Sequence, residues 1–408
     1  MGSNFRKFLL LWSGELVSSI GGGLTSFGLG VYIFNRTGSA AGMALVTLLG
    51  FLPGLLLSVP AGVLADRYDR RLLMMIGDGC SALGILYILF SMLRGEASLA
   101  QICAGVFISS VFSALLEPSY KATITDLLTK EEFSRASGLV SIAGSARYLF
   151  APVIAGFLLG ISDVKLLLAI DICTFFLTVA AAAVVRRGLP CGEPVEREPF
   201  LRSLREGWRV ITGKRGLPAL IAVSALVTLF MGTFQVLAKP FMLSFSDAQT
   251  LGITETACAC GMLAAALVLG IRGIRKGYAK ILGLSLLAAG AAMFCFGLTT
   301  GLPVIICSGF LFFAALPAAN NCIDYLARTN IPQETQGRAW GLIGFLSQTG
   351  YVIAYAVSGV LADAIGNASG AGSGAGPAAV IRAAGILLAL AAGSVLMMKR
   401  VRGLEKTE

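Results

Sequence analysis

Long apolar runs separated by short polar connections are the main pattern along this 408-residue chain. An α-helix needs about 20 apolar residues to cross the hydrocarbon core of a bilayer, and it satisfies its backbone hydrogen bonds within the segment. We therefore predict an all-α membrane protein with twelve transmembrane helices. The predicted spans are 8–34, 41–64, 72–93, 99–125, 136–160, 165–187, 216–242, 250–273, 278–298, 302–326, 337–362 and 379–398.

The composition agrees with this pattern and excludes several classes of protein. Hydrophobic residues make up 56% of the chain and charged residues only 13%, against about 25% charged in soluble domains. We therefore exclude a soluble enzyme and a nucleic-acid-binding protein. The chain has no histidine, which removes His-dependent nucleophiles and His-ligated metals. We predict no enzymatic activity, no metal and no cofactor.

The distribution of basic residues predicts the orientation. With the N-terminus in the cytoplasm, all but five of the 32 Lys and Arg residues fall on the inner side, as the positive-inside rule requires. An even number of spans places both termini in the cytoplasm. The five on the outer side are Arg36, Arg94, Lys165, Lys239 and Arg382.

The two halves of the chain carry the same motif. Residues 131–139 and 334–342 share Glu, Arg, Ala, Gly and Leu at the same spacing, and both copies enter the fifth span of a half. Repeats in one orientation imply two pseudo-symmetric six-helix bundles with a substrate cavity between them near the midplane. We predict an N-terminal bundle over 1–187, a cytoplasmic linker over 188–215 and a C-terminal bundle over 216–408.

The predicted linker holds a short amphipathic pattern. Phe200, Leu204, Trp208 and Ile211 share one face of a helix, and arginines occupy the other. This pattern is typical of a helix that lies on a membrane surface.

The inner end of the second span reads Gly62-Val-Leu-Ala-Asp66-Arg67-Tyr-Asp69-Arg70-Arg71. This segment resembles the signature loop of the major facilitator superfamily. Other segments are similar to the macrolide-efflux branch of its drug–proton antiporters and to the siderophore exporters of that branch. They are Glu15, Gly21–Gly23, Asn35–Ser39, Glu117-Pro118, Ala151-Pro152, Gln336–Arg338 and Gly359-x-Leu-Ala-Asp363.

The resemblance implies alternating access by rocking of two bundles, with the signature loop as a cytoplasmic latch. Asp66 would face the start of the eleventh span, Arg70 would pair with Asp126, and Gly62 would allow close packing. The implied latch residues are Gly62, Asp66, Arg67, Asp69, Arg70, Arg71 and Asp126. An alternative is that the arginines only anchor the topology. Ile271 and Ile274 replace the acids in the second-half loop, so a latch there would be weaker.

Polar side chains inside spans are costly and usually line a cavity. Glu15 and Glu117 lie near mid-depth, and Arg147 is deep enough to neutralise one of them. We predict that Glu15 or Glu117 takes up a proton in exchange for substrate; a structural Glu–Arg pair or recognition of substrate charge are the alternatives. The predicted coupling and substrate residues are Glu15, Glu117, Arg147, Gln235, Asn320, Asn321, Asp324 and Gln348.

We expect three other charged residues to be less central to transport. We expect Asp78 and Asp171 to be less central, because each lies near a span end where water or a neighbour can satisfy it. Lys239 lies near an outer end and can extend its amine to the interface.

The predicted function is proton-coupled efflux of amphipathic drug-like compounds such as macrolides. Export of a siderophore or another endogenous metabolite, import, and a non-transporting membrane sensor are the alternatives. The expected partners are a small-molecule substrate, protons and membrane lipids, without nucleic acid. We expect a monomer in the bacterial cell (inner) membrane.

Overall fold

The computed structural model describes residues 3–186, 208–209, 211–213, 216–332, 336–370 and 372–406. These residues form helices and connections and contain no strand. Twelve spans are long and apolar enough to cross a membrane, which confirms the predicted all-α class. They are Asn4–Thr37, Ala40–Arg67, Arg70–Leu93, Leu99–Leu127, Ala136–Ile161, Val164–Arg186, Leu217–Leu243, Ala248–Arg272, Tyr278–Phe296, Leu302–Asn330, Ala339–Ser369 and Ala375–Met397.

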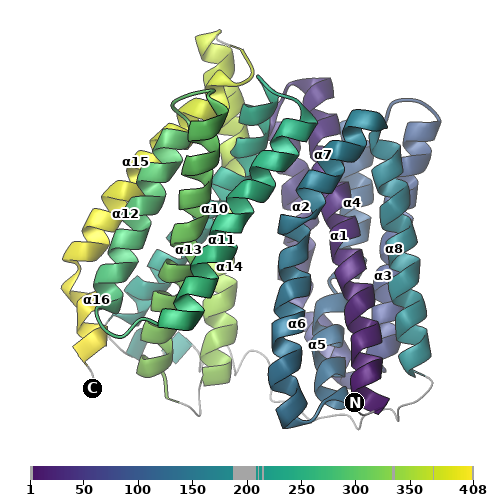
Figure 1. The fold of residues 1–408 in the computed structure, drawn as a ribbon, viewed down its shortest axis with the longest axis horizontal. Coiled ribbons are helices and arrows are strands. Elements are labelled where there is room, and N and C mark those ends of the chain that lie inside the picture. Colours follow the sequence, from purple (N-terminus) through teal and green to yellow (C-terminus); the bar gives the residue numbers. More distant parts are fainter. Residues whose placement is uncertain are drawn as a thin grey trace. The chain divides into compact units, whose positions relative to one another are not determined.

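The helices follow these spans closely (Figure 1). The first half contains α1 (Ser3–Thr37), α2 (Ala40–Arg67), α3 (Arg70–Leu93), α4 (Leu99–Ser113), α5 (Leu116–Leu127), α6 (Lys130–Leu149), α7 (Ala151–Ile161) and α8 (Val164–Arg186). The second half contains α10 (Leu217–Leu243), α11 (Ala248–Arg272), α12 (Tyr278–Phe296), α13 (Leu302–Asn330), α14 (Gln336–Ser369), α15 (Ala375–Met397) and α16 (Lys399–Gly403), followed by a 3₁₀ turn at Leu404–Lys406.

Two spans are broken at proline. A proline ring clashes with the carbonyl four residues earlier and provides no N–H. Pro118 therefore disturbs the helix at Ala114, and the fourth span divides there into α4 and α5. Pro152 stands in the first turn of α7, just after the break at Phe150 that separates it from α6. Glu117 and Arg147 lie next to these breaks.

The chain divides into two compact units, which we describe separately. The first comprises residues 1–37, 45–196 and 247–253, and the second 38–44, 197–246 and 254–408. In the first, α1 packs on α6, α7 and α8, and α3 packs on α4 and α8. In the second, α12 packs on α13 and α15, and α10 packs on α14.

The predicted domain limits and the linker helix stay predictions. Residues 187–207 lie outside the described residues, and so does Glu334, which begins the second copy of the repeated motif. Of the proposed amphipathic face, Trp208 is exposed and Ile211 is buried.

Glycines allow the closest helix contacts in both units. A Cβ on Gly84 of α3 would lie 2.6 Å from the backbone N of Ser109, and a Cβ on Gly105 of α4 would lie 2.6 Å from the carbonyl O of Gly84. Small residues let membrane helices approach until their backbones touch. These two glycines therefore set the distance between α3 and α4.

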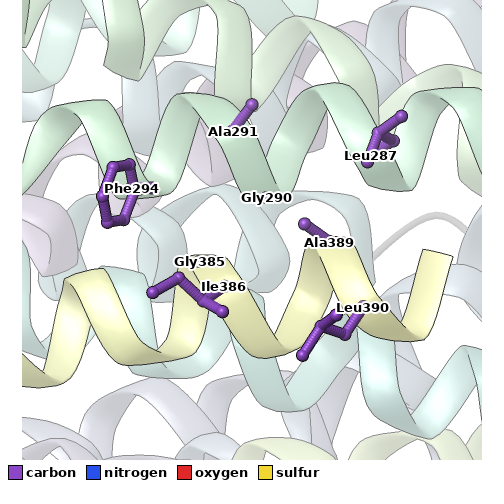
Figure 2. A pocket seen from close by; sticks show the side chains of 8 residues that line it. All are labelled: Leu287, Gly290, Ala291, Phe294, Gly385, Ile386, Ala389 and Leu390. Atoms are coloured by element: carbon purple, nitrogen blue, oxygen red, sulfur yellow. The ribbon is translucent and has the colours of Figure 1, made fainter. Parts of the chain in front are cut away.

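The second unit repeats this arrangement between α12 and α15. Figure 2 shows Gly290 and Gly385 beside an apolar groove between the two helices. A Cβ on Gly290 would lie 2.8 Å from the carbonyl O of Gly385. Only apolar residues line the groove, so it offers no group that could orient a polar substrate.

Gly105→Ala should lower the unfolding temperature, because the added methyl group overpacks the contact between α3 and α4 at a cost of about 1–3 kcal/mol. Gly138→Ala is the matched control. It changes a helical glycine whose Cβ would meet nothing within 4 Å, so the gain in helix propensity should leave stability equal or higher by roughly 0.5–1 kcal/mol. Thermal unfolding of both variants in one detergent tests this; equal shifts would contradict it.

Candidate functional site

The loop between α2 and α3 is held by Asp69. One carboxylate oxygen of Asp69 accepts a hydrogen bond from the backbone N of Arg71 at 3.0 Å and caps the start of α3. The other accepts a hydrogen bond from Nε of Arg186 at 2.7 Å, at the end of α8. Asp69 therefore links the start of the third span to the end of the sixth.

The arginines of the same loop reach the fourth span. Nη1 of Arg70 lies 2.5 Å from Oδ1 of Asp126, and Nε of Arg70 donates to the carbonyl of Ala65 at 3.1 Å. Nη2 of Arg71 lies 3.7 Å from Oδ2 of Asp126. The pairing of Arg70 with Asp126 expected from the sequence is therefore present, and the latch role of these residues stays a prediction.

The close packing expected at Gly62 is not made in this structure. A Cβ built on Gly62 would meet no described atom within 4 Å. Asp66 is half-buried and Arg67 is exposed at the C-terminal end of α2. Gly62 therefore leaves open space beside α2 instead of filling a helix contact.

The contacts of Asp69 favour the charged form of its carboxyl group. Partial burial opposes the charged form, but the hydrogen bonds from Arg186 and from the backbone of Arg71 and Leu72 outweigh it and lower the pKa of Asp69. Since the pKa is lower in the folded protein than in the unfolded chain, the charged form stabilises the fold above the ordinary pKa of about 4. This stabilisation is lost as the pH falls further.

Asp69→Asn should lower the unfolding temperature at neutral pH, and the difference from the unmodified protein should shrink below about pH 4. Arg186→Gln removes the ion pair but keeps the cap on α3, so it should cost less over the same pH range. Thermal unfolding between pH 7 and pH 3 measures both. A loss for Asp69→Asn that is the same at all pH values would show that the charge of Asp69 does not matter.

Three acidic residues on different helices lie inside the first unit. Glu15 comes from α1, Asp78 from α3 and Asp171 from α8, and the charges of Glu15 and Asp171 both act on Asp78. Asp78 and Asp171 are each only 1% exposed. Neither carboxylate oxygen of Asp78 has a partner within normal hydrogen-bonding distance among the described residues, and the expectation that water or a neighbour satisfies Asp78 stays a prediction.

A stripe of small residues on α1 brings this group together. Gly14, Ser18, Gly21 and Thr25 recur at helical spacing, and a Cβ on Gly21 would lie 2.8 Å from Oδ1 of Asp171. Small residues at this spacing let α1 lie directly on α8.

Two threonines on α8 are the nearest hydroxyl donors. Oγ1 of Thr174 donates to the carbonyl of Asp171 at 2.7 Å and reaches Oδ1 of Asp171 at 3.4 Å. Thr178 lies close to Asp78, but its hydroxyl is directed to the carbonyls of Gly14 and Thr174, each at 3.3 Å. Both hydroxyls donate to backbone carbonyls, and that of Thr178 also lies near the Asp78 carboxyl.

Glu117 and Arg147 have different surroundings from those expected. Glu117 has a side chain that is 76% exposed and lies 2.6 Å from Nζ of Lys121, one turn along α5. Its charge also acts on Glu15, whose Oε2 is buried without a hydrogen-bond partner. Arg147 is exposed, and its charge acts on Asp171. No ion pair among the described residues joins Arg147 to either glutamate.

The second unit holds the remaining predicted residues. The hydroxyl of Tyr355 on α14 donates to Oε1 of Gln235 on α10 at 3.1 Å. Asn320, Asn321 and Asp324 are exposed on α13, and Gln348 is half-buried on α14. Of these five residues, only Gln235 makes a side-chain hydrogen bond to another span within the part of the chain that the structure describes.

An ion pair in the second unit was not predicted. Nζ of Lys239 on α10 lies 3.8 Å from Oε1 of Glu255 on α11, and the two side chains are 22% and 23% exposed. Lys239 thus has a carboxylate partner instead of only extending to the interface. The sequence contained a feature that could have indicated this ion pair, because Glu255 is an acidic residue inside the eighth span.

The first unit holds buried carboxyl groups that form no candidate metal site among the described residues. Within the described part of the chain, no three His, Cys, Asp or Glu side chains are placed to hold a metal, and metal ions need several oxygen ligands. A single buried carboxyl can hold a proton without further ligands. Twelve membrane-length helices with acidic groups inside them are the features of a secondary transporter.

The comparisons agree with this class. The model of the Major Facilitator Superfamily matches residues 11–246, and the chain belongs to this family. Its members are transporters and not enzymes, as the sequence predicts. With the twelve apolar helices, this membership indicates a multi-pass bacterial membrane protein that carries a small molecule.

Several curated transporters are similar over most of the chain. Macrolide efflux protein A of Streptococcus pyogenes is 27% identical over 88% of this chain and 89% of its own length. Multidrug efflux pump Tap of Mycolicibacterium fortuitum is 25% identical over 87% and 89%. Enterobactin exporter EntS of Shigella flexneri is 25% identical over 74% and 71%.

Solved structures share the fold. A bacterial homologue of the human lysosomal transporter Spinster, in an inward-facing and unoccupied conformation, has a TM-score of 0.75 at 17% identity, covering 97% of each chain. An inward-facing bacterial homologue of the iron transporter ferroportin has a TM-score of 0.73 at 16% identity, covering 97% of this chain and all of the other.

Proposed function

We propose that this protein is an exporter that exchanges protons for amphipathic, positively charged compounds such as macrolides by alternating access. The observation that carries the proposal is the acidic group of Glu15, Asp78 and Asp171 inside the first unit. The similarity to macrolide and multidrug efflux proteins supports the direction of transport and the class of substrate.

The proton would reside on the acidic group. An unpaired carboxylate in a dry interior costs several kcal/mol, whereas a protonated carboxyl is buried far more cheaply. Asp78 has no partner for either oxygen, and Glu15 has none for Oε2. We therefore extend the expected coupling residues from Glu15 and Glu117 to Asp78 and Asp171, with Glu15 on α1 as the link to Glu117.

The charge of this group also bears on the substrate. A cationic amphiphile would be attracted to Glu15 and Glu117, and its arrival would favour release of a proton from the same group. In the second unit, Met231, Tyr351 and Tyr355 are the proposed apolar contacts of a substrate. Gln235, Asn320, Asn321, Asp324 and Gln348 are the proposed hydrogen-bonding groups there.

A second substrate class has support of its own. Enterobactin exporters are among the relatives, and Lys239 and Arg147 are basic groups inside predicted spans that suit an anionic siderophore or another endogenous metabolite. In either case we propose a monomer in the bacterial cell membrane with both termini in the cytoplasm, supported by the basic inner segments.

Transport in proteoliposomes tests the coupling. With an imposed proton gradient, Asp78→Asn and Glu15→Gln should each lower proton-driven uptake of a labelled macrolide at least about tenfold, the loss typical of a positioned proton-transfer group. Asp163→Asn, in the exposed connection before α8, is the control and should transport normally. Full proton-driven flux in Asp78→Asn, Glu15→Gln and Glu117→Gln would refute the proposal.

Drug resistance separates the substrate classes. Expression in a strain that lacks its own efflux pumps should raise the inhibitory concentration of macrolides several-fold, and Glu15→Gln should abolish the increase. Unchanged macrolide sensitivity together with export of a catecholate siderophore would favour the second class.

A further inference from the structure

A groove on the surface of the second unit runs between α12 and α15 (Figure 2). Gly290 and Gly385 are buried where the two helices touch, and the exposed side chains of Leu287, Ile386 and Leu390 border the groove on either side. Its volume is about 370 Å³, within the range of about 300–1,000 Å³ that is typical of small-molecule sites. Because an empty apolar groove forfeits the contacts of its lining atoms, a flexible apolar chain is the occupant that it suits.

Arg382 marks one end of this groove. It precedes Ile386 and Leu390 at intervals of four residues, so the three side chains share one face of α15. A Cβ on Gly297 would lie 2.9 Å from Cγ of Arg382, and Gly297 follows Phe294 of the groove by about one helical turn. The stem of Arg382 therefore lies across the carboxyl end of α12, where both rows of groove residues end.

The guanidinium of Arg382 has no acceptor in the described part of the protein. Arg382 is half-buried and makes no hydrogen bond or ion pair with the described residues. The carboxyl end of α12 favours a positive charge nearby, but neither α12 nor α15 contains an aspartate or a glutamate. A basic side chain within a membrane span is costly unless an anion or the headgroup layer receives it. The anion for Arg382 is therefore expected from outside these two helices.

The length of the groove fits one leaflet of a bilayer. From Arg382 to Leu390 the helix rises about 12 Å, and half of the hydrocarbon core of a bilayer measures about 15 Å. Arg382 lies near the start of the predicted span 379–398, and Gly297 near the end of the predicted span 278–298. The charge therefore lies close to the headgroup layer, and the apolar groove runs from it towards the middle of the bilayer.

We propose that this groove is a binding site for an anionic phospholipid. One acyl chain of the lipid lies in the groove between α12 and α15, and Arg382 binds the phosphate of the headgroup. A guanidinium can donate two parallel hydrogen bonds to the oxygens of one phosphate, which makes arginine well suited to this contact. In the predicted topology the lipid belongs to the outer leaflet. The site is independent of the transported substrate and of the proton.

A second copy of the chain is the other occupant that an apolar groove could receive. In a symmetric dimer the same face of each copy meets its counterpart. Such a dimer would bring two Arg382 side chains to one interface, and α12 and α15 would supply no carboxylate for either of them. A phospholipid supplies both the apolar chain and the anion, so the charge of this face favours the lipid.

Native mass spectrometry of the purified full-length protein tests the site, with phosphatidylglycerol and phosphatidylcholine of identical chains titrated in separate samples. The first phosphatidylglycerol should bind more tightly than the first phosphatidylcholine. Arg382→Gln should lower the affinity for phosphatidylglycerol by about tenfold or more, as expected for loss of hydrogen bonds to a charged group, and should leave phosphatidylcholine unchanged. Ala291→Phe should weaken phosphatidylglycerol binding without changing the charge, because Ala291 is exposed in the groove and the added ring fills it.

Arg94→Gln is the matched control. Arg94 is an exposed arginine just after α3 in the first unit, where its guanidinium lies over the ring of Phe90, so its loss should leave phosphatidylglycerol binding unchanged. Equal losses in Arg94→Gln and Arg382→Gln would show attraction to surface charge alone and overturn the proposal. Unchanged phosphatidylglycerol binding in both Arg382→Gln and Ala291→Phe would also overturn it, as would a lipid-free dimer that Ala291→Phe dissociates.

Discussion

The close approach of α1 to α8 is the constraint on which the candidate site depends. Without side chains at Gly14 and Gly21, the two helices lie backbone to backbone, and Asp171 comes within reach of α1. The same contact seals Asp78 of α3 from water. In lipid, helices gain little from burying apolar surface against one another, so small residues that allow tight packing decide which polar groups meet. The acidic group is therefore a consequence of glycine placement.

Outside the apolar core, charged and capping groups hold the span ends. Asp69 joins α3 to α8, Asp126 receives the arginines that follow α2, and Asp363 completes the start of α2. Each contact places a carboxylate against an arginine or a helix start, where its charge is compensated. The core of the first unit, in contrast, holds the carboxyl of Asp78, which has no arginine or helix start beside it among the described residues.

Several features were predictable because they depend on local pattern. Spans follow from the length of apolar runs, the breaks at Pro118 and Pro152 follow from proline geometry, and the pairing of Arg70 with Asp126 follows from the resemblance of the signature loop. The complete burial of Asp78 and Asp171 was not anticipated, since depth along a span says nothing about the face on which a side chain lies. The spacing of Asp171, Thr174 and Thr178 with the small residues of α1 was the signal that could have revealed them.

The sequence by itself determined the twelve spans and the family, because the length of apolar runs and short motifs are local properties of the chain. Only the tertiary structure decided which acids lie together and which helix start Asp363 caps. Those outcomes depend on the rotation and spacing of helices that are far apart in sequence, and these are set by packing between side chains of different spans.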